Sequence, residues 1–466
     1  MAQALLNIEQ MRYFGAIIKA SEAKNLEIAL LKYATNPHKA TIKSLLRDYS
    51  IAFSEILESE FESQMQALEQ EAYLDNLLEQ IQQEIRAESK ERDSSIQALV
   101  RFLLQLAISA RASDVHIELD MENVRVRFRI DGVLVEKFCF AMWLFAPLSS
   151  SIKLLAHLNL TESRQPQDGR FSLQLKNIAK ESQSFDFRIS TLPLVQGESL
   201  VLRILDRHKT LIPLESLGFG AVELTQIKNL SHLPFGLVLI TGPTGSGKST
   251  TMYGILNILK HRNLKIITLE DPVEYRLEHI NQVAMSKDVE FVSVLRNVLR
   301  QDPDVISLGE VRDKERLQLA IQAAFTGHLV FATLHTNDAL DSIVRLLDMG
   351  VESHFITQSL SGILAQRLLR KLCDCKELRN GHYVPKGCVK CNNTGYFGRI
   401  AIAEVVMASR ELEAFIKGKM SKAEILEHLE REIPHFTLES KARLLVERGI
   451  TDEVEMYRVV KNALYC

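Results

Sequence analysis

A glycine-rich segment at residues 242–250 has the residue types that bind the phosphate chain of a nucleotide. It reads Gly-Pro-Thr-Gly-Ser-Gly-Lys-Ser-Thr, a complete G-x-x-x-x-G-K-S/T pattern. Glycines let backbone N–H groups turn inward around phosphate oxygens, and the start of the following helix adds partial positive charge. Lys248 is expected to reach the β- and γ-phosphates, and Ser249 to hold Mg²⁺. The expected nucleotide-binding residues are Gly242, Pro243, Thr244, Gly245, Ser246, Gly247, Lys248, Ser249 and Thr250.

The segments on either side of this loop have the pattern that the motif requires. Residues 237–241 are apolar and β-prone, which predicts a buried strand, and the apolar positions of 249–259 predict a helix. The alternative is a chance glycine-rich turn. A strand before the loop and a helix after it favour a phosphate-binding loop over that alternative.

Three more predicted strands end in side chains that could do chemistry on a bound phosphate. Residues 265–269 lead to Glu270 and Asp271, residues 304–309 lead to Glu310, and residues 330–334 lead to His335. Each of these alone could be an ordinary polar group at the end of a strand. Because ligands bind outside the carboxyl ends of parallel strands, we expect these side chains to converge beside the phosphate loop.

One of these strand ends departs from the common pattern, in which an Asp precedes the Glu. Gly309 occupies the Asp position and has no side chain with which to bind a metal-bound water. Glu310 is then expected to serve the Mg²⁺ shell, the attacking water, or both, with Glu270 as the second carboxylate. A carboxylate that accepts a hydrogen bond from water can orient it toward the γ-phosphorus.

Four of the six cysteines lie within a short segment, as a Cys-x-Cys pair and a Cys-x-x-Cys pair. They are Cys373, Cys375, Cys388 and Cys391. Four thiolates suit a tetrahedral Zn²⁺ ion, and in a reducing compartment such a cluster indicates metal rather than disulfides. The single residue between the first two cysteines is expected to strain a shared site, so a metal-free loop is the alternative.

The composition limits the classes of protein that fit. The chain has 466 residues and a net charge of −3, which indicates several domains and no strong attraction to nucleic acid. Its longest apolar runs are too short for a membrane span, and the first residues lack the pattern of a secretory signal. We therefore expect a cytoplasmic protein.

The pattern along the chain predicts an α/β protein of several parts. Residues 1–62 read as a small α+β domain with a strand near 13–18. Residues 63–94 read as an acidic connecting helix with solvated charges and one apolar stripe, formed by Leu74, Leu77, Leu78, Ile81 and Ile85. A second α+β domain follows at 95–215, where 124–130 alternates apolar and basic residues before an Asp-Gly turn. The remaining parts are a nucleotide-binding domain at 216–370, the cysteine segment at 371–398 and a C-terminal helical region at 399–466.

Taken together, the motifs resemble those of the secretion ATPases of type II secretion systems and type IV pilus assembly. Residues 242–250 are similar to the Walker A motif of that family, 267–275 to its aspartate box, 299–313 to its atypical Walker B motif and 326–338 to its histidine box. Segments of the second domain match as well, at 112–118, 128–132 and 197–203. The resemblance covers about residues 95–465. Residues 12–62 resemble a shortened, diverged form of the N-terminal docking domain of the family.

The resemblance implies a RecA-like P-loop ATPase fold for residues 216–370. It also implies a Mg²⁺-dependent, hexameric ATPase that drives pseudopilus or type IV pilus assembly. The catalytic residues it implies are Glu310, Glu270, Lys248, His335, His328, Arg188 and Arg203. It also implies an inner-membrane platform protein and a membrane-bound docking protein as partners, so that the chain associates peripherally with the inner membrane. A tetracysteine segment is typical of assembly and export members of the family.

Three alternatives stay open, namely a pilus retraction motor, a nucleic-acid translocase and a scaffold that binds nucleotide without hydrolysing it. The alternating strand 124–130 carries arginines but no aromatic residues for base stacking, so direct nucleic-acid binding is not expected. Cyclic-di-GMP binding is not expected either, because residues 1–11 are too few for the helices that bind it in longer family members.

Overall fold

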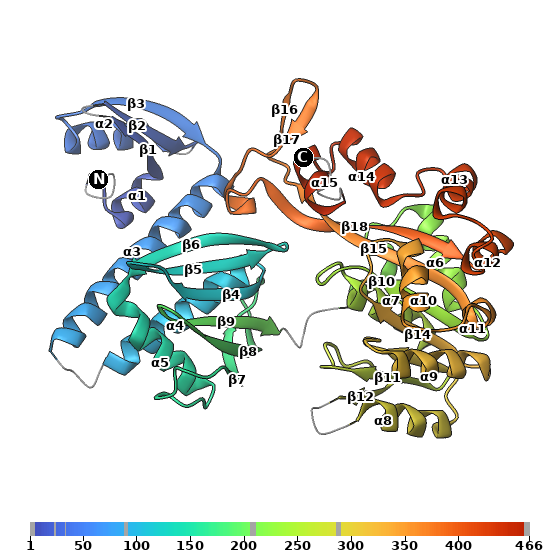
Figure 1. Ribbon diagram of the computed structural model, residues 1–466. Coiled ribbons are helices and arrows are strands. Elements are labelled where there is room, and N and C mark those ends of the chain that lie inside the picture. The colour runs from blue at the N-terminus through green and yellow to red at the C-terminus, as the bar shows by residue number, and fades with distance from the viewer. Residues whose placement is uncertain are drawn as a thin grey trace.

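Two large sheets carry most of the chain, and a small three-stranded sheet precedes them (Figure 1). The computed structural model describes residues 5–22, 25–32, 34–87, 92–205, 211–285 and 290–460. Within this part of the chain, no helix combines the length and the apolar character needed to cross a membrane.

The small N-terminal domain packs helices against a sheet of the order β1-β2-β3. Its elements are α1 (Ile8–Phe14), β1 (Ala16–Glu22), β2 (Asn25–Leu31), α2 (Asn36–Leu45) and β3 (Ser50–Ile56). The strand predicted near residues 13–18 begins later, because α1 occupies the chain up to Phe14. A capping box at Asn7 and Gln10 starts that helix, and Gly15, at a φ of 59°, ends it.

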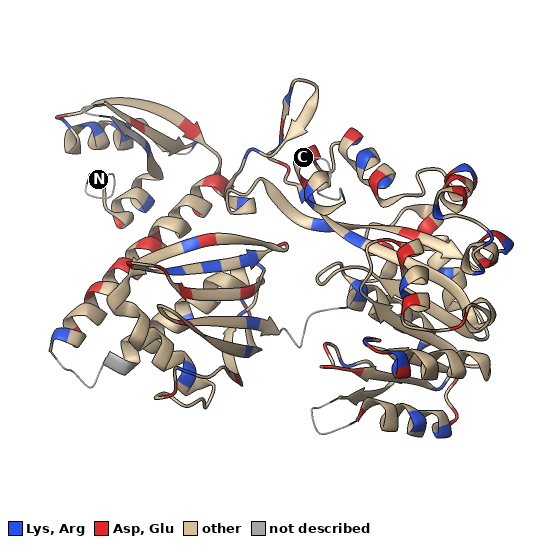
Figure 2. Cartoon of the chain, viewed as in Figure 1, with Lys and Arg blue, Asp and Glu red and all other residues tan. Residues whose placement is uncertain are grey.

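The acidic segment forms one long helix, α3 (Glu58–Arg86), which packs into two cores. Phe61 and Met65 are buried in the N-terminal domain. Leu74, Leu77 and Ile81 are buried against α4 (Arg92–Ser109) of the second domain. The apolar stripe predicted in this helix is therefore its buried face, and acidic positions recur along the helix (Figure 2). A boundary at residue 62 would cut this helix.

The second domain is an antiparallel sheet of the order β6-β5-β4-β9-β8-β7, covered on one face by α4 and α5. Its further elements are β4 (Ala112–Leu119), β5 (Asn123–Ile130), β6 (Val133–Ala141), η2 (Met142–Leu144), α5 (Phe145–Leu155), β7 (Gln167–Lys176), β8 (Ser182–Leu194) and β9 (Gly197–Leu205). The predicted alternation in β5 is confirmed, since Val124, Val126 and Phe128 are buried while the arginines between them lie on the other face.

The third sheet has the order β12-β11-β13-β14-β10-β15-β18 and is parallel except for its last strand. Its elements are η3 (Leu214–Ser216), α6 (Ala221–Ser231), β10 (Gly236–Thr241), α7 (Lys248–Leu259), β11 (Ile266–Glu270), β12 (Asn281–Ala284), α8 (Phe291–Val298), η4 (Leu299–Gln301), β13 (Val305–Leu308), α9 (Lys314–Phe325), β14 (Leu329–Leu334), α10 (Ala339–Asp348), α11 (Ser353–Ser359), β15 (Leu360–Leu372) and β18 (Tyr396–Met407). Every residue of β10 and β14 is buried, as expected for central parallel strands.

The expectation of helix from residue 399 was wrong at its start, because β18 runs from Tyr396 to Met407. It pairs with β15 from Gly362 opposite Met407 to Leu372 opposite Tyr396. Periodicity cannot distinguish such a short apolar run from a buried helix. The predicted helices follow as α12 (Arg410–Ile416), α13 (Lys422–Glu432), α14 (Leu438–Glu447) and α15 (Glu453–Val459).

The cysteine segment between β15 and β18 contains a projecting hairpin (Figure 1). The hairpin is formed by β16 (Glu377–Arg379) and β17 (His382–Val384), and η5 (Val389–Cys391) follows it.

Candidate active site

The glycine-rich loop connects β10 to α7 and leads directly into the N-terminus of that helix. Gly242 and Gly247 have φ values of 147° and 90°. A β-carbon at Gly242 would lie 2.6 Å from the backbone oxygen of Gln366, and one at Gly247 would lie 2.7 Å from Nε2 of Gln366. The glycines are thus required both by the left-handed backbone and by the closeness of β15.

Lys248 folds back over this loop, with Nζ 2.7 Å from the carbonyl oxygen of Gly242 and 3.1 Å from that of Pro243. Burial lowers the pKa of Lys248 to about 8; the charge of Glu310 works in the opposite direction and that of Arg367 adds to the decrease. The buried hydroxyl of Ser246 makes no hydrogen bond within the described residues. A partly desolvated ammonium and an unpaired hydroxyl at a glycine cradle fit the phosphates of a nucleotide.

Glu310 follows β13 and forms the centre of an ionic cluster. Its carboxylate lies 2.7 Å from Nη2 of Arg312 and 3.2 Å from Nε2 of His335, which follows β14. Burial alone would raise the pKa of Glu310, but the hydrogen bond and charge of Arg312 outweigh it, and the pKa is lowered. Burial, assisted by the charge of Lys248, lowers the pKa of His335. Near neutral pH the cluster therefore has an ionised Glu310 beside a neutral imidazole.

Glu270 ends the neighbouring strand β11, but its carboxylate is held by three side chains. Tyr253 donates a short hydrogen bond to it, Thr268 Oγ1 lies at 2.5 Å and Gln282 Nε2 at 3.0 Å. The predicted convergence of strand ends is confirmed for Glu270 and Glu310, since the N–H of Gly309 donates to the carbonyl of Leu269 at 2.8 Å. The two carboxylates differ in how firmly they are held. Glu310 is bound mainly by the exposed side chains of Arg312 and His335, whereas three hydrogen bonds fix Glu270 in place.

Two sets of expected residues do not join this cluster. His328 precedes β14, so it lies at the opposite end of the strand, about 20 Å from the phosphate edge at about 3.3 Å per residue. There its Nδ1 atom lies 2.8 Å from the carbonyl of Ala323. The histidine motif spans the whole of β14, so His328 and His335 lie at opposite edges of the sheet, and a catalytic role for His328 stays a prediction.

Arg188 and Arg203 lie opposite each other on β8 and β9. Nε of Arg203 is 3.1 Å from Oδ1 of Asp114, within the second domain. Among the described residues, no hydrogen bond or ion pair joins either arginine to the glycine-rich loop. A contribution from them to this site requires either movement of the second domain or a neighbouring chain.

Two residues that support the loop, Gln366 and Arg367, belong to no recognised motif and were not predicted from the sequence. Gln366 on β15 is buried and bonds to both the loop and α7. Arg367 donates to the backbone oxygens of Gln366 and Asn337 at 3.0 and 2.5 Å. The register of β15 beside β10 could have placed them here, since Ala365 pairs with Thr241 at the start of the loop.

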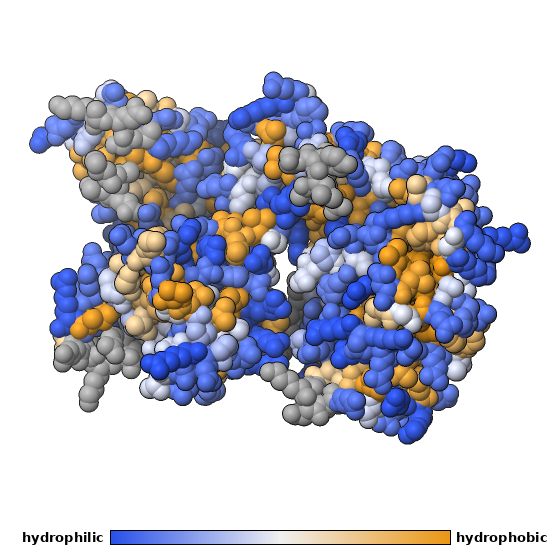
Figure 3. All heavy atoms as spheres, viewed as in Figure 1, coloured by the Kyte–Doolittle hydropathy of each residue, from blue (hydrophilic) through white to orange (hydrophobic). Residues whose placement is uncertain are grey.

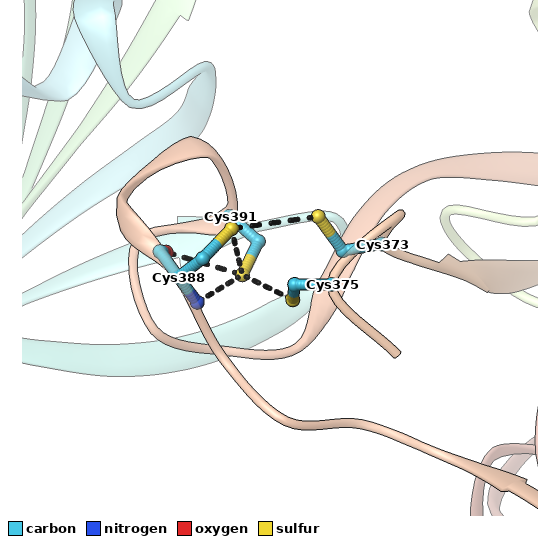
Figure 4. Close-up of side chains that lie close together, drawn as sticks. All are labelled: Cys373, Cys375, Cys388 and Cys391. Atoms are coloured by element: carbon cyan, nitrogen blue, oxygen red, sulfur yellow. Dashed lines mark hydrogen bonds between the residues drawn. The ribbon is translucent and has the colours of Figure 1, made fainter. Parts of the chain in front are cut away.

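The four predicted zinc ligands come together in the cysteine segment (Figure 4). Sγ–Sγ distances are 3.8 Å for Cys373 and Cys388, 3.9 Å for Cys375 and Cys391, and 3.7 Å for Cys388 and Cys391. Zn–S bonds of about 2.3 Å in a tetrahedron give edges of about 3.8 Å. The backbone N–H groups of Cys388 and Gly395 donate to Cys391 Sγ at 3.1 and 3.2 Å. The donor set fits Zn²⁺, and the short first spacing does not prevent the cluster.

Strand order, glycine-rich loop and strand-end carboxylates together define a RecA-like P-loop ATPase fold, with a second α+β domain before it and a cysteine segment within it. A model of the family described as type II/IV secretion system protein matches residues 89–458. The chain belongs to this secretion ATPase family, as the sequence motifs indicated.

Individual relatives agree with this assignment. Type II secretion system ATPase E of Vibrio cholerae is 39% identical over 408 residues, covering 83% of this chain and 80% of the relative. Type II secretion system protein E of Dickeya dadantii is 42% identical over 390 residues, covering 80% and 77%. The crystal structure of the pilus retraction motor PilT with bound ADP is 27% identical, with a TM-score of 0.54 over 76% of this chain and 95% of that one.

Proposed function

We propose that this chain is a Mg²⁺-dependent ATPase that assembles as a hexamer and drives assembly of a pseudopilus or type IV pilus. The observation that carries this proposal is a complete phosphate loop after β10 together with Glu310 at the end of β13, the next strand but one in the sheet. The side chains of Glu310 and Lys248 are close enough for the charge of each to favour the charged form of the other. Type II secretion proteins that are about 40% identical over most of the chain support a role in this kind of assembly.

The residues divide the chemistry of hydrolysis between them. Loop N–H groups and Lys248 bind the phosphates, and the hydroxyl of Ser249, in the first turn of α7, would hold Mg²⁺, which neutralises phosphate charge when bound. Glu310, ionised and partly exposed, accepts a hydrogen bond from the attacking water and orients it. Glu270 fixes Tyr253 and the end of β11, and assists as the second carboxylate. His335 positions Glu310.

The second domain is proposed to close over the nucleotide and to open after hydrolysis. In this structure it contacts the start of β18 through the carboxylate of Asp131. Asp131 accepts a hydrogen bond from the N–H of Gly398 at 3.0 Å and lies 3.8 Å from Arg399 of β18. Arg111, in the same domain as Asp131, lies 3.6 Å from this carboxylate. Arg111 also lies over the ring of Phe397, 3.8 Å from its centre. Because this contact is small and polar, the second domain could rotate about it or separate from it. Closure would bring Arg188 and Arg203 toward the transferred phosphate.

Assembly into a hexamer is supported by unshielded apolar residues on the ATPase domain. Figure 3 shows apolar side chains gathering over α10, where Val344 and Leu347 are exposed, and Phe355 of α11 is exposed nearby. The N-terminal domain is proposed to dock on a membrane-bound partner, and the assembled motor to act on an inner-membrane platform protein. The chain would then work in the cytoplasm, at the surface of the inner membrane.

Two of the alternatives differ in their support. A retraction motor is favoured by the similarity to PilT, but the four clustered cysteines are typical of assembly members. A nucleic-acid translocase is not favoured, because the basic residues of β5 are paired with carboxylates. Arg125 bonds to Glu136 at 2.8 Å, and Arg127 pairs with Glu118. Such pairs leave little free positive charge for phosphates.

The test compares Glu310→Gln and Lys248→Ala with Glu315→Gln, a matched change at an exposed position on α9. Glu310→Gln should bind ATP with near-normal affinity and lose at least about a hundred-fold in turnover, because an amide accepts poorly from water. Lys248→Ala should lose affinity, and Glu315→Gln should hydrolyse ATP as the wild type does. Wild-type turnover no faster than that of Lys248→Ala would support the scaffold instead, and unchanged turnover in Glu310→Gln would move the role to Glu270.

A further inference from the structure

A buried side-chain amide on β15 makes one hydrogen bond to the phosphate loop and one to the helix that follows it. Gln366 is 1% exposed and follows the stretch of β15 that pairs with β10. Its Nε2 atom lies 2.9 Å from the carbonyl oxygen of Ser246, inside the loop. Its Oε1 atom lies 2.7 Å from the hydroxyl of Thr251, in the first turn of α7. One side chain therefore joins the loop to the helix that follows it.

The chemistry of the partners fixes which way this amide points. The carbonyl oxygen of Ser246 can only accept, so the NH₂ group of Gln366 must face the loop. The amide oxygen then faces Thr251, whose hydroxyl can donate. Both polar ends are satisfied in a site closed to water, where an unpaired group would be costly.

The same residue explains why the loop is glycine at two positions. A β-carbon at Gly242 would lie 2.6 Å from the backbone oxygen of Gln366, and one at Gly247 would lie 2.7 Å from its Nε2 atom. Arg367 donates to that backbone oxygen at 3.0 Å and holds the strand in place. The loop is thus shaped against a fixed surface of β15, rather than by its own glycines alone.

We propose that Gln366 is a positioning residue for nucleotide binding, which holds the glycine-rich loop open for phosphate before the ligand arrives. This inference rests on the proposed ATPase function and adds a residue that touches no part of the substrate. Holding the carbonyl of Ser246 outward keeps the neighbouring N–H groups turned toward the phosphate space. Without the amide, the loop must be ordered by the nucleotide itself, and that ordering weakens binding.

The test measures the affinity for a fluorescently labelled ADP with Mg²⁺, together with ATP turnover and the thermal unfolding midpoint without nucleotide. Gln366→Met keeps the length of the side chain but removes both hydrogen bonds. Gln366→Asn keeps the amide but is too short to reach both partners. Thr251→Val removes the second partner alone. Gln105→Met is the matched control, since Gln105 also bonds with both ends, to the N–H and carbonyl of Lys176 at 2.8 Å each, in the second domain.

The two changes at Gln366 should weaken labelled-ADP binding about ten-fold, equivalent to about 1.4 kcal/mol. Thr251→Val should weaken it about three-fold, and Gln105→Met should leave it unchanged. Turnover at saturating ATP should stay within about two-fold, because the reacting groups remain in place. This division between affinity and turnover would not arise from a merely structural role.

Wild-type affinity in a folded Gln366→Met protein would overturn the positioning role. If that variant fails to fold, Gln366→Asn and Thr251→Val decide, and wild-type affinity in both would overturn it as well. A fall in turnover and unfolding midpoint with no change in affinity would also contradict it. Labelled-ADP binding by the wild type without any hydrolysis would contradict the proposed ATPase and leave the comparison of affinities intact.

Discussion

The lowered pKa of Lys248 predicts that nucleotide binding takes up a proton at mildly alkaline pH. Burial lowers this pKa to about 8, although the charge of Glu310 opposes the decrease. With that value, about half of the free chains carry a neutral Lys248 at pH 8, and about nine-tenths do so at pH 9. Bound phosphates stabilise the charged form, so the neutral fraction must take up a proton when nucleotide binds.

The magnitude follows from that one titration. Binding should take up about half a proton per chain at pH 8 and about 0.9 at pH 9, if the bound lysine stays charged. Apparent affinity should fall about eight-fold between pH 7.5 and pH 9, since only chains with the charged lysine bind well. The sign is that of a lysine whose pKa is lower in the free protein than in the complex: binding weakens as pH rises through the lower value.

The neighbouring groups should not contribute in this window. The pKa of His335 is lowered from 6.5, so its imidazole is neutral throughout, and the pKa of Glu310 is lowered from 4.5, so its carboxylate is ionised throughout. Tyr253 has a raised pKa because it is buried and donates to Glu270, so it stays neutral. The terminal phosphate, with a pKa of about 6 in phosphate monoesters, is already ionised.

Calorimetry of ADP binding in buffers with different ionisation enthalpies measures the proton uptake directly. Lys248→Arg is the control, because a guanidinium stays charged at these pH values and should show neither the uptake nor the slope. Uptake below about 0.1 proton at pH 8.5 in the wild type would refute the lowered pKa. The same slope in Lys248→Arg would assign the titration to another group.

Three further predictions concern other parts of the chain. Purified protein should hold one Zn²⁺ per chain, and Cys391→Ser should lose it and lower the unfolding midpoint by about 5 °C or more; elemental analysis finding no zinc under reducing, chelator-free conditions would contradict this. Arg203→Ala and Arg188→Ala should reduce turnover about a hundred-fold or more with near-normal ADP affinity, whereas the control Arg125→Ala should not reduce turnover. Specific activity should also rise with protein concentration, and equal activity per chain in a strictly monomeric sample would exclude a shared site. Asp131→Ala should speed hydrogen exchange at the Gly398 amide about ten-fold, and unchanged protection there would show that the domain contact does not depend on this carboxylate.

Local sequence was sufficient to identify the elements that carry the phosphate chemistry. Four strands could be predicted, namely those that precede the phosphate loop, Glu270, Glu310 and His335. Each of them is a continuous apolar run with a polar end. The convergence of their ends follows from parallel pairing, which places all carboxyl ends at one edge. The cysteine cluster was predictable for a similar reason, since thiol ligands with short spacings have few other uses in such a segment.

Local sequence was insufficient wherever a residue's role depends on partners far along the chain. Glu270 and Glu310 look alike in the sequence. In the structure, Tyr253 and Gln282 hydrogen-bond to the carboxylate of Glu270, whereas the carboxylate of Glu310 stays accessible. The strand β18 has an apolar run that a helix could also carry, and its pairing with β15 decided the outcome. The apolar stripe of α3 could be predicted from its spacing, but only the structure shows that it packs against α4.

The sequence by itself therefore determined the class of chemistry and the set of residues that could perform it, because a phosphate loop and strand-end carboxylates are encoded by contiguous residues. Only the tertiary structure decided which of these residues meet. Strand register placed Gln366 against two glycines of the loop, the length of β14 separated His328 from His335, and the domain arrangement kept Arg188 and Arg203 away from Lys248. These are distances between segments remote in sequence, and no local pattern specifies them.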